Sequence, residues 1–163
     1  MSKYIVCSDI HGRSGSFMKV LAAEKKADGI IIAGDLELDP NDIADMVRSC
    51  IPDCSIYAVA GNCDAYSPAA VTLRPLAVFD IEGNNKVLLT HGHRYSVPRT
   101  DILSYSAEEQ GCNIVIFGHT HRYLCQKEAG ILFVNPGALR NGEYALLTVG
   151  DDGGVDVVRK DIR

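Results

Sequence analysis

Five short apolar runs, each ending in a residue that can bind a metal ion, constrain the fold of this chain more than any other feature. The runs are YIVCSD (4–9), GIIIAGD (29–35), IYAVAGN (56–62), KVLLTH (86–91) and NIVIFGH (113–119). Runs of this length, rich in Ile and Val and separated by helical or loop segments, are typical of strands buried on both faces of an α/β sheet. The sequence therefore predicts an α/β fold.

Helical spacing appears between the first three runs. In segment 14–27 it is carried by Phe17, Val20, Leu21 and Ala23 or Glu24. This segment joins the first two runs, so the predicted strands form a βαβ unit and are parallel. Segment 39–54 begins with an N-cap, Asp39 or Asn41. Its apolar stripe consists of Ile43, Met46, Val47 and Cys50.

A third helix is predicted over 99–112, ending at Gly111 as a C-cap residue. Its expected inner side carries Ile102, Leu103 and Tyr105 or Ser106. Beyond it the pattern changes, and segments 130–137, 143–150 and 155–162 have the character of antiparallel strands. The sequence GDDGG is the expected hairpin turn between the last two.

The side chains at the ends of the five runs are the candidate metal ligands. They are Asp9, His11, Asp35, Asn62, His91, His119 and His121, and a glycine accompanies each group. Ligands of α/β sheets collect at the carboxyl ends of parallel strands, so the runs would bring all of these side chains into one crevice. Taken alone, the pair His119 and His121 is equally typical of polar surface at a strand end. Any one of the glycines is equally typical of an ordinary turn.

Seven candidate ligands are too many for one metal ion and suit two. A nitrogen and oxygen set without thiolate disfavours structural zinc and favours Mn, Fe, Ni or catalytic Zn. Ions in a two-metal site lie about 3.5–4 Å apart and share a bridging carboxylate, for which Asp35 is the natural candidate. Such a site lowers the pKa of a bridging water and stabilises an in-line displacement at phosphorus, which predicts phosphate-ester hydrolysis.

The ordered series DIHG, GD, GNCD, THGH and GHTH, with a later NPG at 135–137, resembles the calcineurin-like metallophosphoesterase superfamily. The lack of insertions resembles its compact bacterial and archaeal phosphodiesterase branch, which is related to a retromer subunit. The resemblance implies two mixed β-sheets packed as a sandwich and flanked by helices. It also implies one metal ion held by Asp9, His11, Asp35 and His121. The second would be held by Asp35, Asn62, His91 and His119.

The sequence departs from many superfamily members at Cys63, where they have a histidine that protonates the leaving group or binds phosphate. A thiol is a weaker acid, so diesters and esters with good leaving groups are expected to be preferred over alkyl monoesters. The compact branch often has cysteine here. Asp64 is expected to cap the following turn, and His93 either contacts substrate or supports the ligands from outside.

Composition bounds the partners and the setting. The 163 residues are expected to form a single domain, 1–163, with one core. A net charge of −5 disfavours binding of long nucleic acids. With no signal peptide or membrane-spanning run, and six cysteines expected to stay thiols, the predicted location is cytoplasmic. A homodimer is compatible with the sequence, but nothing in it requires one.

The expected function is thus a di-metal phosphodiesterase, with Mn the favoured ion and Ni, Zn or Fe as alternatives. A metal-bridging hydroxide would attack a small soluble phosphate ester, with low-ranked catalytic roles for Cys63 and His93. Two alternatives stay open: a phosphomonoesterase of a nucleotide or sugar phosphate, and a protein-binding scaffold without turnover. The full ligand set favours an enzyme.

Overall fold

The computed structural model describes all 163 residues as two five-stranded sheets with helices on both sides. The first sheet has the order β10 (Val155–Asp161), β9 (Glu143–Val149), β1 (Ser2–Cys7), β2 (Gly29–Ile32) and β3 (Ser55–Ala58). The second has the order β4 (Leu76–Ile81), β5 (Asn85–Thr90), β6 (Ile114–Ile116), β8 (Ile131–Pro136) and β7 (Tyr123–Glu128). The predicted sandwich of two mixed sheets is confirmed.

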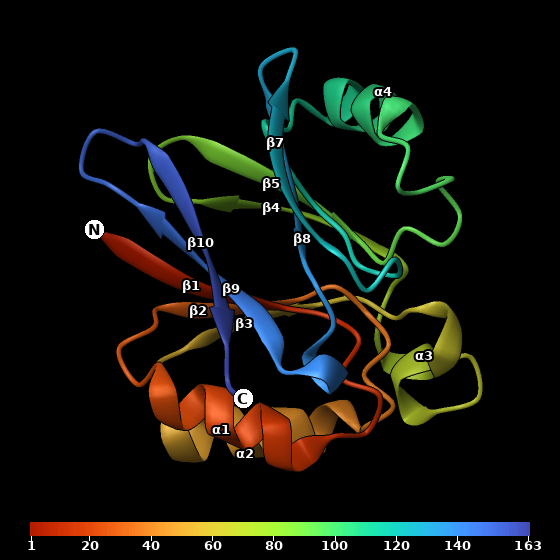
Figure 1. Cartoon of the computed structure of the whole chain (residues 1–163), viewed down its shortest axis with the longest axis vertical. Coiled ribbons are helices and arrows are strands. Elements are labelled where there is room, and N and C mark those ends of the chain that lie inside the picture. Colours follow the sequence, from red (N-terminus) through yellow and green to blue (C-terminus); the bar gives the residue numbers. More distant parts are fainter.

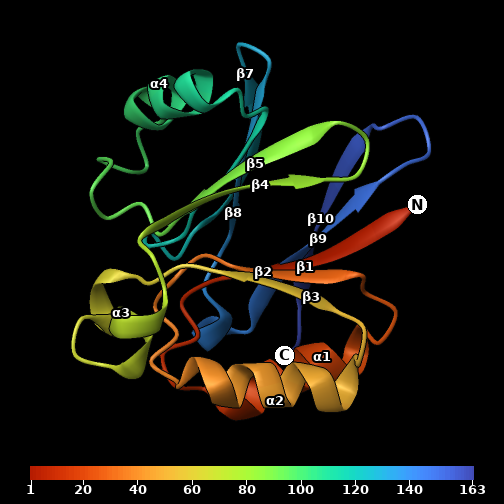
Figure 2. The ribbon, with the colours of Figure 1, turned by 180° about the vertical axis from the view of Figure 1, so that it is seen from behind.

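The helices are α1 (Ser14–Ala23), α2 (Pro40–Cys50), α3 (Pro68–Thr72) and α4 (Asp101–Gln110), with 3-10 turns η1 (Asn62–Asp64) and η2 (Leu139–Asn141). Figure 1 shows α1 and α2 together below the first sheet and α4 beyond the second, so the molecule has four layers. Figure 2 shows the same order from behind. None of the helices is long and apolar enough to cross a membrane.

The apolar runs are continuous because both faces of their strands are covered. Along β1, Ile5 packs against the layer of α1 and α2, whereas Val6 points toward the second sheet. Along β5, Leu88 packs under α4 and Leu89 faces the first sheet. The core therefore consists of three apolar clusters, one at each junction between neighbouring layers.

Most of the local predictions are confirmed. Strands β1 and β2 are parallel, and α2 begins after Asp39, whose Oδ1 accepts the backbone N–H of Asn41 at 2.9 Å. Helix α4 ends at Gly111 with a left-handed φ of 69°. Strands β9 and β10 are antiparallel neighbours joined by the predicted hairpin turn.

The predicted inner side of α4 is correct at Leu103 and wrong at Ile102 and Tyr105. Its buried stripe is Leu103 and Ala107, spaced by one helical turn, while Ile102 and Tyr105 are 41% and 71% exposed. Where a helix packs on a sheet through one narrow stripe of residues, the residues one or two positions away from that stripe point toward solvent. The prediction placed the stripe on the bulkiest residues rather than on the i, i+4 pair.

The second sheet also differs from the prediction at its edges. Strand β8 is parallel to β6 and antiparallel only to β7, a strand that the sequence pattern did not reveal. Strand β7 is an edge strand with the mixed sequence YLCQKE, which lacks an apolar alternation. Strand β4, which pairs antiparallel with β5 at the opposite edge, is a second strand that the sequence pattern did not reveal.

Candidate metal centre

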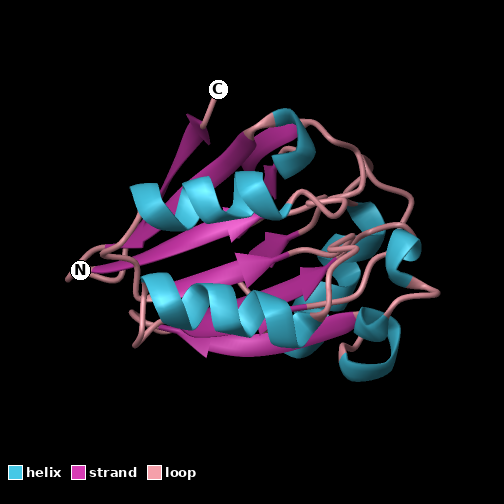
Figure 3. Ribbon diagram, turned by 90° about the horizontal axis from the view of Figure 1, so that it is seen from below, coloured by secondary structure: helices cyan, strands magenta, loops and turns pink.

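The candidate ligands lie where parallel strands from both sheets end. Asp9, Asp35 and Asn62 follow β1, β2 and β3 of the first sheet. His91 follows β5 of the second sheet, and the pair His119 and His121 follows β6. Figure 3 shows the loops after these strands gathered on one side of the molecule. The predicted crevice is thus formed between two sheets rather than along a single one.

Asp9 lies at the centre of this group. Its side chain is fully buried, and its Oδ1 lies 3.1 Å from His121 Nε2, 3.5 Å from His11 Nε2 and 3.9 Å from His91 Nε2. This oxygen has no hydrogen-bond partner. The other oxygen, Oδ2, accepts the Ser8 hydroxyl at 2.7 Å and the backbone N–H of His119 at 3.1 Å. Burying an unpartnered carboxylate oxygen is costly unless a cation lies beside it.

Two histidines are oriented by acceptors on the outer side of their rings. Nδ1 of His91 lies 2.7 Å from the carbonyl oxygen of Ala33, and Nδ1 of His11 lies 2.5 Å from Glu37 Oε1. Because carbonyl and carboxylate oxygens only accept, the Nδ1 of each ring donates to them and the Nε2 of each ring points inward. Nε2 of His91 then faces Asp35 Oδ2 at 3.1 Å.

Lone pairs that face one another require a proton or a metal ion between them. Nε2 of His11 lies 3.4 Å from Nε2 of His121, and His119 Nδ1 lies 3.3 Å from His91 Nε2. Two ligands about 2.0–2.2 Å from one metal ion are themselves about 3–3.5 Å apart. The nitrogen and oxygen donor set, its spacing and the unpartnered Asp9 oxygen therefore fit divalent metal ions.

Asp35 joins the two sides of the group. Its Oδ1 accepts the backbone N–H of Cys63 at 2.8 Å, which holds the loop of Asn62 against it. Burial raises the pKa of Asp35, but hydrogen bonds from His91 and Cys63 and the charge of His91 outweigh burial, and the pKa is about 2. Burial lowers the pKa of His91, yet the hydrogen bond and charge of Asp35 raise it overall. Asp35 is thus a carboxylate whose Oδ2 lies 3.8 Å from His11 Nε2 and 3.1 Å from His91 Nε2.

The backbone around these ligands is left-handed at residues other than glycine. The φ angle is 56° at Asp9, 53° at Asp35, 69° at His119 and 60° at His121. Each such residue costs about 1–3 kcal/mol and persists only where its surroundings fix it. The backbone N–H of Asp9 donates to the carbonyl oxygen of Gly34 at 3.0 Å, so neighbouring loops hold each other.

Two of the accompanying glycines are needed for space rather than for a positive φ. A Cβ at Gly61 would lie 2.2 Å from Asp35 Oδ1, and a Cβ at Gly118 would lie 2.0 Å from the hydroxyl oxygen of Ser8. The backbone at these positions therefore passes directly against the buried carboxylates or their partners. The predicted link between glycine and a close backbone approach applies at both positions.

Two residues outside the predicted ligand set hold it in place. Glu37 orients His11, and Asn135 at the end of β8 donates to the carbonyl oxygen of Gly118 and to the Thr120 hydroxyl, both at 3.0 Å. Asn135 belongs to the NPG sequence, which already contributed to the family resemblance and so marked this residue as a candidate. The sequence did not mark Glu37 as a site residue, because an acidic residue two positions after Asp35 is also typical of exposed loops.

Asp64 does not cap the turn that follows it with its side chain. Its fully buried carboxylate accepts three backbone N–H groups, at 2.9 Å from Gly61, 2.9 Å from Glu37 and 3.2 Å from Leu36. The carboxylate therefore ties the loop after β2 to the loop after β3. The sequence could not reveal that Asp64 binds the backbone of Leu36 and Glu37, because these residues lie 28 and 27 positions earlier in the chain.

Cys63 and His93 both lie beside the ligands. Cys63 Sγ, a His11 ring nitrogen and an Asp35 oxygen lie within 4.8 Å of one another, and Cys63 is exposed. Burial and the nearby carboxylate of Asp35 raise the pKa of Cys63 to about 11. The His93 ring centroid lies 5.6 Å from that of His91, and burial together with the charge of His91 lowers its pKa. Both residues are near enough to meet a substrate.

This fold and this group of side chains define a metallophosphoesterase. Residues 3–152 match the calcineurin-like phosphoesterase superfamily domain, and the chain belongs to that family. It is 31% identical over 157 residues to the probable metallophosphoesterase YsnB of Bacillus subtilis, covering 91% of this chain and 85% of the relative. A probable metallophosphoesterase of Mycoplasma pneumoniae is 30% identical over 145 residues, covering 85% and 80%. The family places the chain among hydrolases that use divalent metals.

Solved structures agree with this assignment. A predicted phosphoesterase from Streptococcus pneumoniae superposes with a TM-score of 0.74 at 26% identity, covering 98% of both chains. An archaeal phosphodiesterase superposes with a TM-score of 0.75 at 18% identity, covering 97% of this chain and 99% of that one. Vps29 from Entamoeba histolytica in complex with Zn²⁺ gives 0.70 at 21% identity, covering 99% of each. At these lower identities the similarity shows the fold alone.

Proposed function

We propose that this protein is a phosphodiesterase that hydrolyses a small phosphate diester and uses two divalent metal ions, with Mn²⁺ the favoured pair. The observation that supports it most is the unpartnered Oδ1 of Asp9, buried among the Nε2 atoms of His11, His91 and His121. Divalent ions held there would polarise the phosphoryl group and supply an activated water. Asp35, which keeps its negative charge down to about pH 2, is placed between the two proposed ion positions.

The ligand roles are those that the family resemblance implies. Asp9, His11, Asp35 and His121 would hold one ion, and Asp35, Asn62, His91 and His119 the other. The first set is supported by the mutual distances of 3.1–3.8 Å among Asp9, Asp35 and the two imidazoles. The second is supported by the contacts of His91 with Asp35 and His119 at 3.1 and 3.3 Å.

The preference for diesters rests on the position of Cys63. A general acid works best when its pKa lies near the working pH, and a thiol with a pKa of about 11 gives up its proton reluctantly. Leaving groups that need protonation, such as alkoxides of alkyl monoesters, are therefore served poorly. His93, with its lowered pKa, is mostly neutral at pH 7 and would contact the phosphoryl oxygens or the leaving group through a ring N–H.

The test compares bis(4-nitrophenyl) phosphate with 4-nitrophenyl phosphate after metal-stripped protein has been loaded with Mn²⁺, Ni²⁺ or Zn²⁺. We expect metal-dependent turnover of the diester, slower turnover of the monoester, and loss of both in Asn62→Ala. Asn41→Ala is the matched control, because Asn41 lies on the exposed first turn of α2. If neither ester is hydrolysed with both positions occupied, the phosphodiesterase proposal is wrong and a protein-binding scaffold takes its place.

The setting of the protein is proposed on composition. Six free cysteines, two of them exposed, suit a reducing cytoplasm. The net charge of −5 supports a small-molecule substrate over long nucleic acids. The homodimer stays a prediction that a sedimentation measurement would test.

A further inference from the structure

Two hollows flank the candidate metal centre, one on each side. The Phe117 pocket, with a volume of about 550 Å³, is lined by His119 together with Val97, Pro98, Phe117, Tyr123 and Leu124 among others. The His93 pocket, of about 400 Å³, is lined by His93, Asn62 and Arg94 among others. Each pocket thus includes a proposed ligand of the second ion, His119 in one and Asn62 in the other. A phosphoryl group at the ions would have both pockets within reach.

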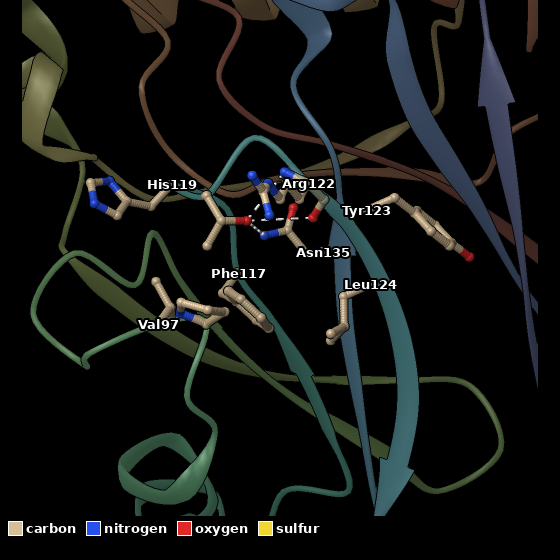
Figure 4. Close-up of a pocket in the computed structure, with 9 residues that line it drawn as sticks. Val97, Phe117, His119, Arg122, Tyr123, Leu124 and Asn135 are labelled. Carbon is tan, nitrogen blue, oxygen red and sulfur yellow. Dashed lines mark hydrogen bonds between the residues drawn. The ribbon is translucent and has the colours of Figure 1, made fainter.

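The Phe117 pocket has apolar walls and polar groups that are already paired. Figure 4 shows Val97, Phe117 and Leu124 along one side, Asn135 and Arg122 along the other, and His119 at one end. Asn135 Nδ2 donates to the Thr120 hydroxyl and the carbonyl oxygen of Gly118, and its Oδ1 accepts the backbone N–H of Gly137. The free surface offered to a ligand is therefore mainly hydrocarbon.

We assign the leaving group of the substrate to the His93 pocket. A leaving oxygen departs with negative charge and needs hydrogen-bond donors, and Asn62, His93 and Arg94 offer them in the His93 pocket. Nδ1 of His93 is buried and has no hydrogen-bond partner. In the Phe117 pocket His119 is a proposed ligand and the amide of Asn135 is already paired, which leaves Arg122 as the one cationic donor there. The group that remains on phosphorus is thus directed to the Phe117 pocket.

We propose that the Phe117 pocket is a substrate subsite that binds the retained ester group of a phosphodiester, and that this group is an apolar ring, aromatic or of similar size. The inference rests on the proposed phosphodiesterase function and names the class of substrate. The volume of about 550 Å³ lies within the range of small-molecule pockets, about 300–1,000 Å³. A monoester has no second ester group to place in this pocket.

The first experiment uses two diesters with the same leaving group, phenyl 4-nitrophenyl phosphate and methyl 4-nitrophenyl phosphate. We expect kcat/KM of the metal-loaded protein to favour the phenyl diester about 10-fold or more, beyond their ratio in solution. Leu124→Gln, which keeps the size of the side chain and removes its apolar character, should lower this preference at least about threefold. Cys125→Ser is the matched control on the same strand, since alternate residues face opposite sides of a sheet.

The ratio of two substrates on one preparation does not depend on how much of the protein is folded. An equal phenyl-to-methyl ratio in the wild type and Leu124→Gln overturns the subsite and leaves the phosphodiesterase proposal standing. A ratio that falls in Leu124→Gln and stays unchanged in Cys125→Ser supports it.

The second experiment reports binding without turnover. Phenylphosphonate and methylphosphonate are added to Zn²⁺-loaded protein whose Leu and Val methyl groups are labelled for NMR. Phenylphosphonate should shift the methyl signals of Leu124 and Val97, and methylphosphonate should leave them in place. If both diesters resist hydrolysis while these shifts appear, the phosphodiesterase proposal is overturned and binding of the ring stands. Without the shifts, the subsite itself is overturned.

Discussion

Replacing Asp64 by alanine should destabilise the protein strongly, although Asp64 is not among the proposed ligands. Its fully buried carboxylate accepts backbone N–H groups of Gly61, Leu36 and Glu37 at 2.9, 3.2 and 2.9 Å. A hydrogen bond to a charged group contributes about 1.5–3 kcal/mol. Three at the lower end of that range give an expected loss of about 4.5 kcal/mol in the free energy of unfolding, or about 9–18 °C in Tm for a domain of this size.

Urea unfolding followed by circular dichroism measures this loss on metal-free protein, where ligand binding cannot contribute. Asp53→Ala is the control, because Asp53 is exposed in the loop before β3 and its removal should cost less than about 0.5 kcal/mol. Asp64→Asn, which keeps one acceptor oxygen, should fall between the two. A loss below about 1 kcal/mol in Asp64→Ala would refute the reasoning, because the three N–H groups would then find other partners at little cost.

Three further predictions concern other parts of the molecule. Cys63→His should raise the hydrolysis of an alkyl monoester such as ethyl phosphate relative to 4-nitrophenyl phosphate, whose leaving group needs no proton; an unchanged ratio would count against a role for Cys63 in leaving-group chemistry. Gly118→Ala places a Cβ 2.0 Å from the Ser8 hydroxyl and 2.8 Å from Asp9 Oδ2, so calorimetry should find Zn²⁺ affinity about 10–100-fold lower, while Gly15→Ala, with open space around it, leaves affinity unchanged. Burial and the hydrogen bond to Glu24 raise the pKa of Tyr144 to about 12, so its neutral form stabilises the fold below pH 10 and this contribution is lost as the pH rises from about 10 to 12. The stability of Tyr144→Phe should decline less over that interval, and parallel curves would contradict the assignment.

The parts of the fold that the sequence predicts are those where burial acts on both faces of a strand. Strand β2 is apolar at Ile30, Ile31 and Ile32 because helices cover one side and the second sheet the other. The edge strand β7 has one neighbour and an exposed Lys127, so its composition does not differ from that of a loop. Only the family resemblance predicted how the runs are divided between two sheets, because the sequence of an apolar strand does not show which strand lies beside it.

The site was predictable where it depends on residue type and order along the chain. Asp9 and His91 follow apolar runs, and the fold brings them together because both runs end at the same side of the molecule. Residues that act through backbone groups were not predictable. Asp64 accepts N–H groups, which every residue but proline carries, so no particular partner type marks its role.

The proposed ligand set is divided between the two sheets, with four residues after strands of the first and three after strands of the second. Metal ions bound there would be crosslinks between two halves of the sandwich that otherwise touch through an apolar layer. Separating the sheets and releasing the ions would then be a single event. At an ion concentration about 100 times the dissociation constant of the site, binding would add about 2.7 kcal/mol to the free energy of unfolding. The proposed catalytic centre would then also hold the two sheets together.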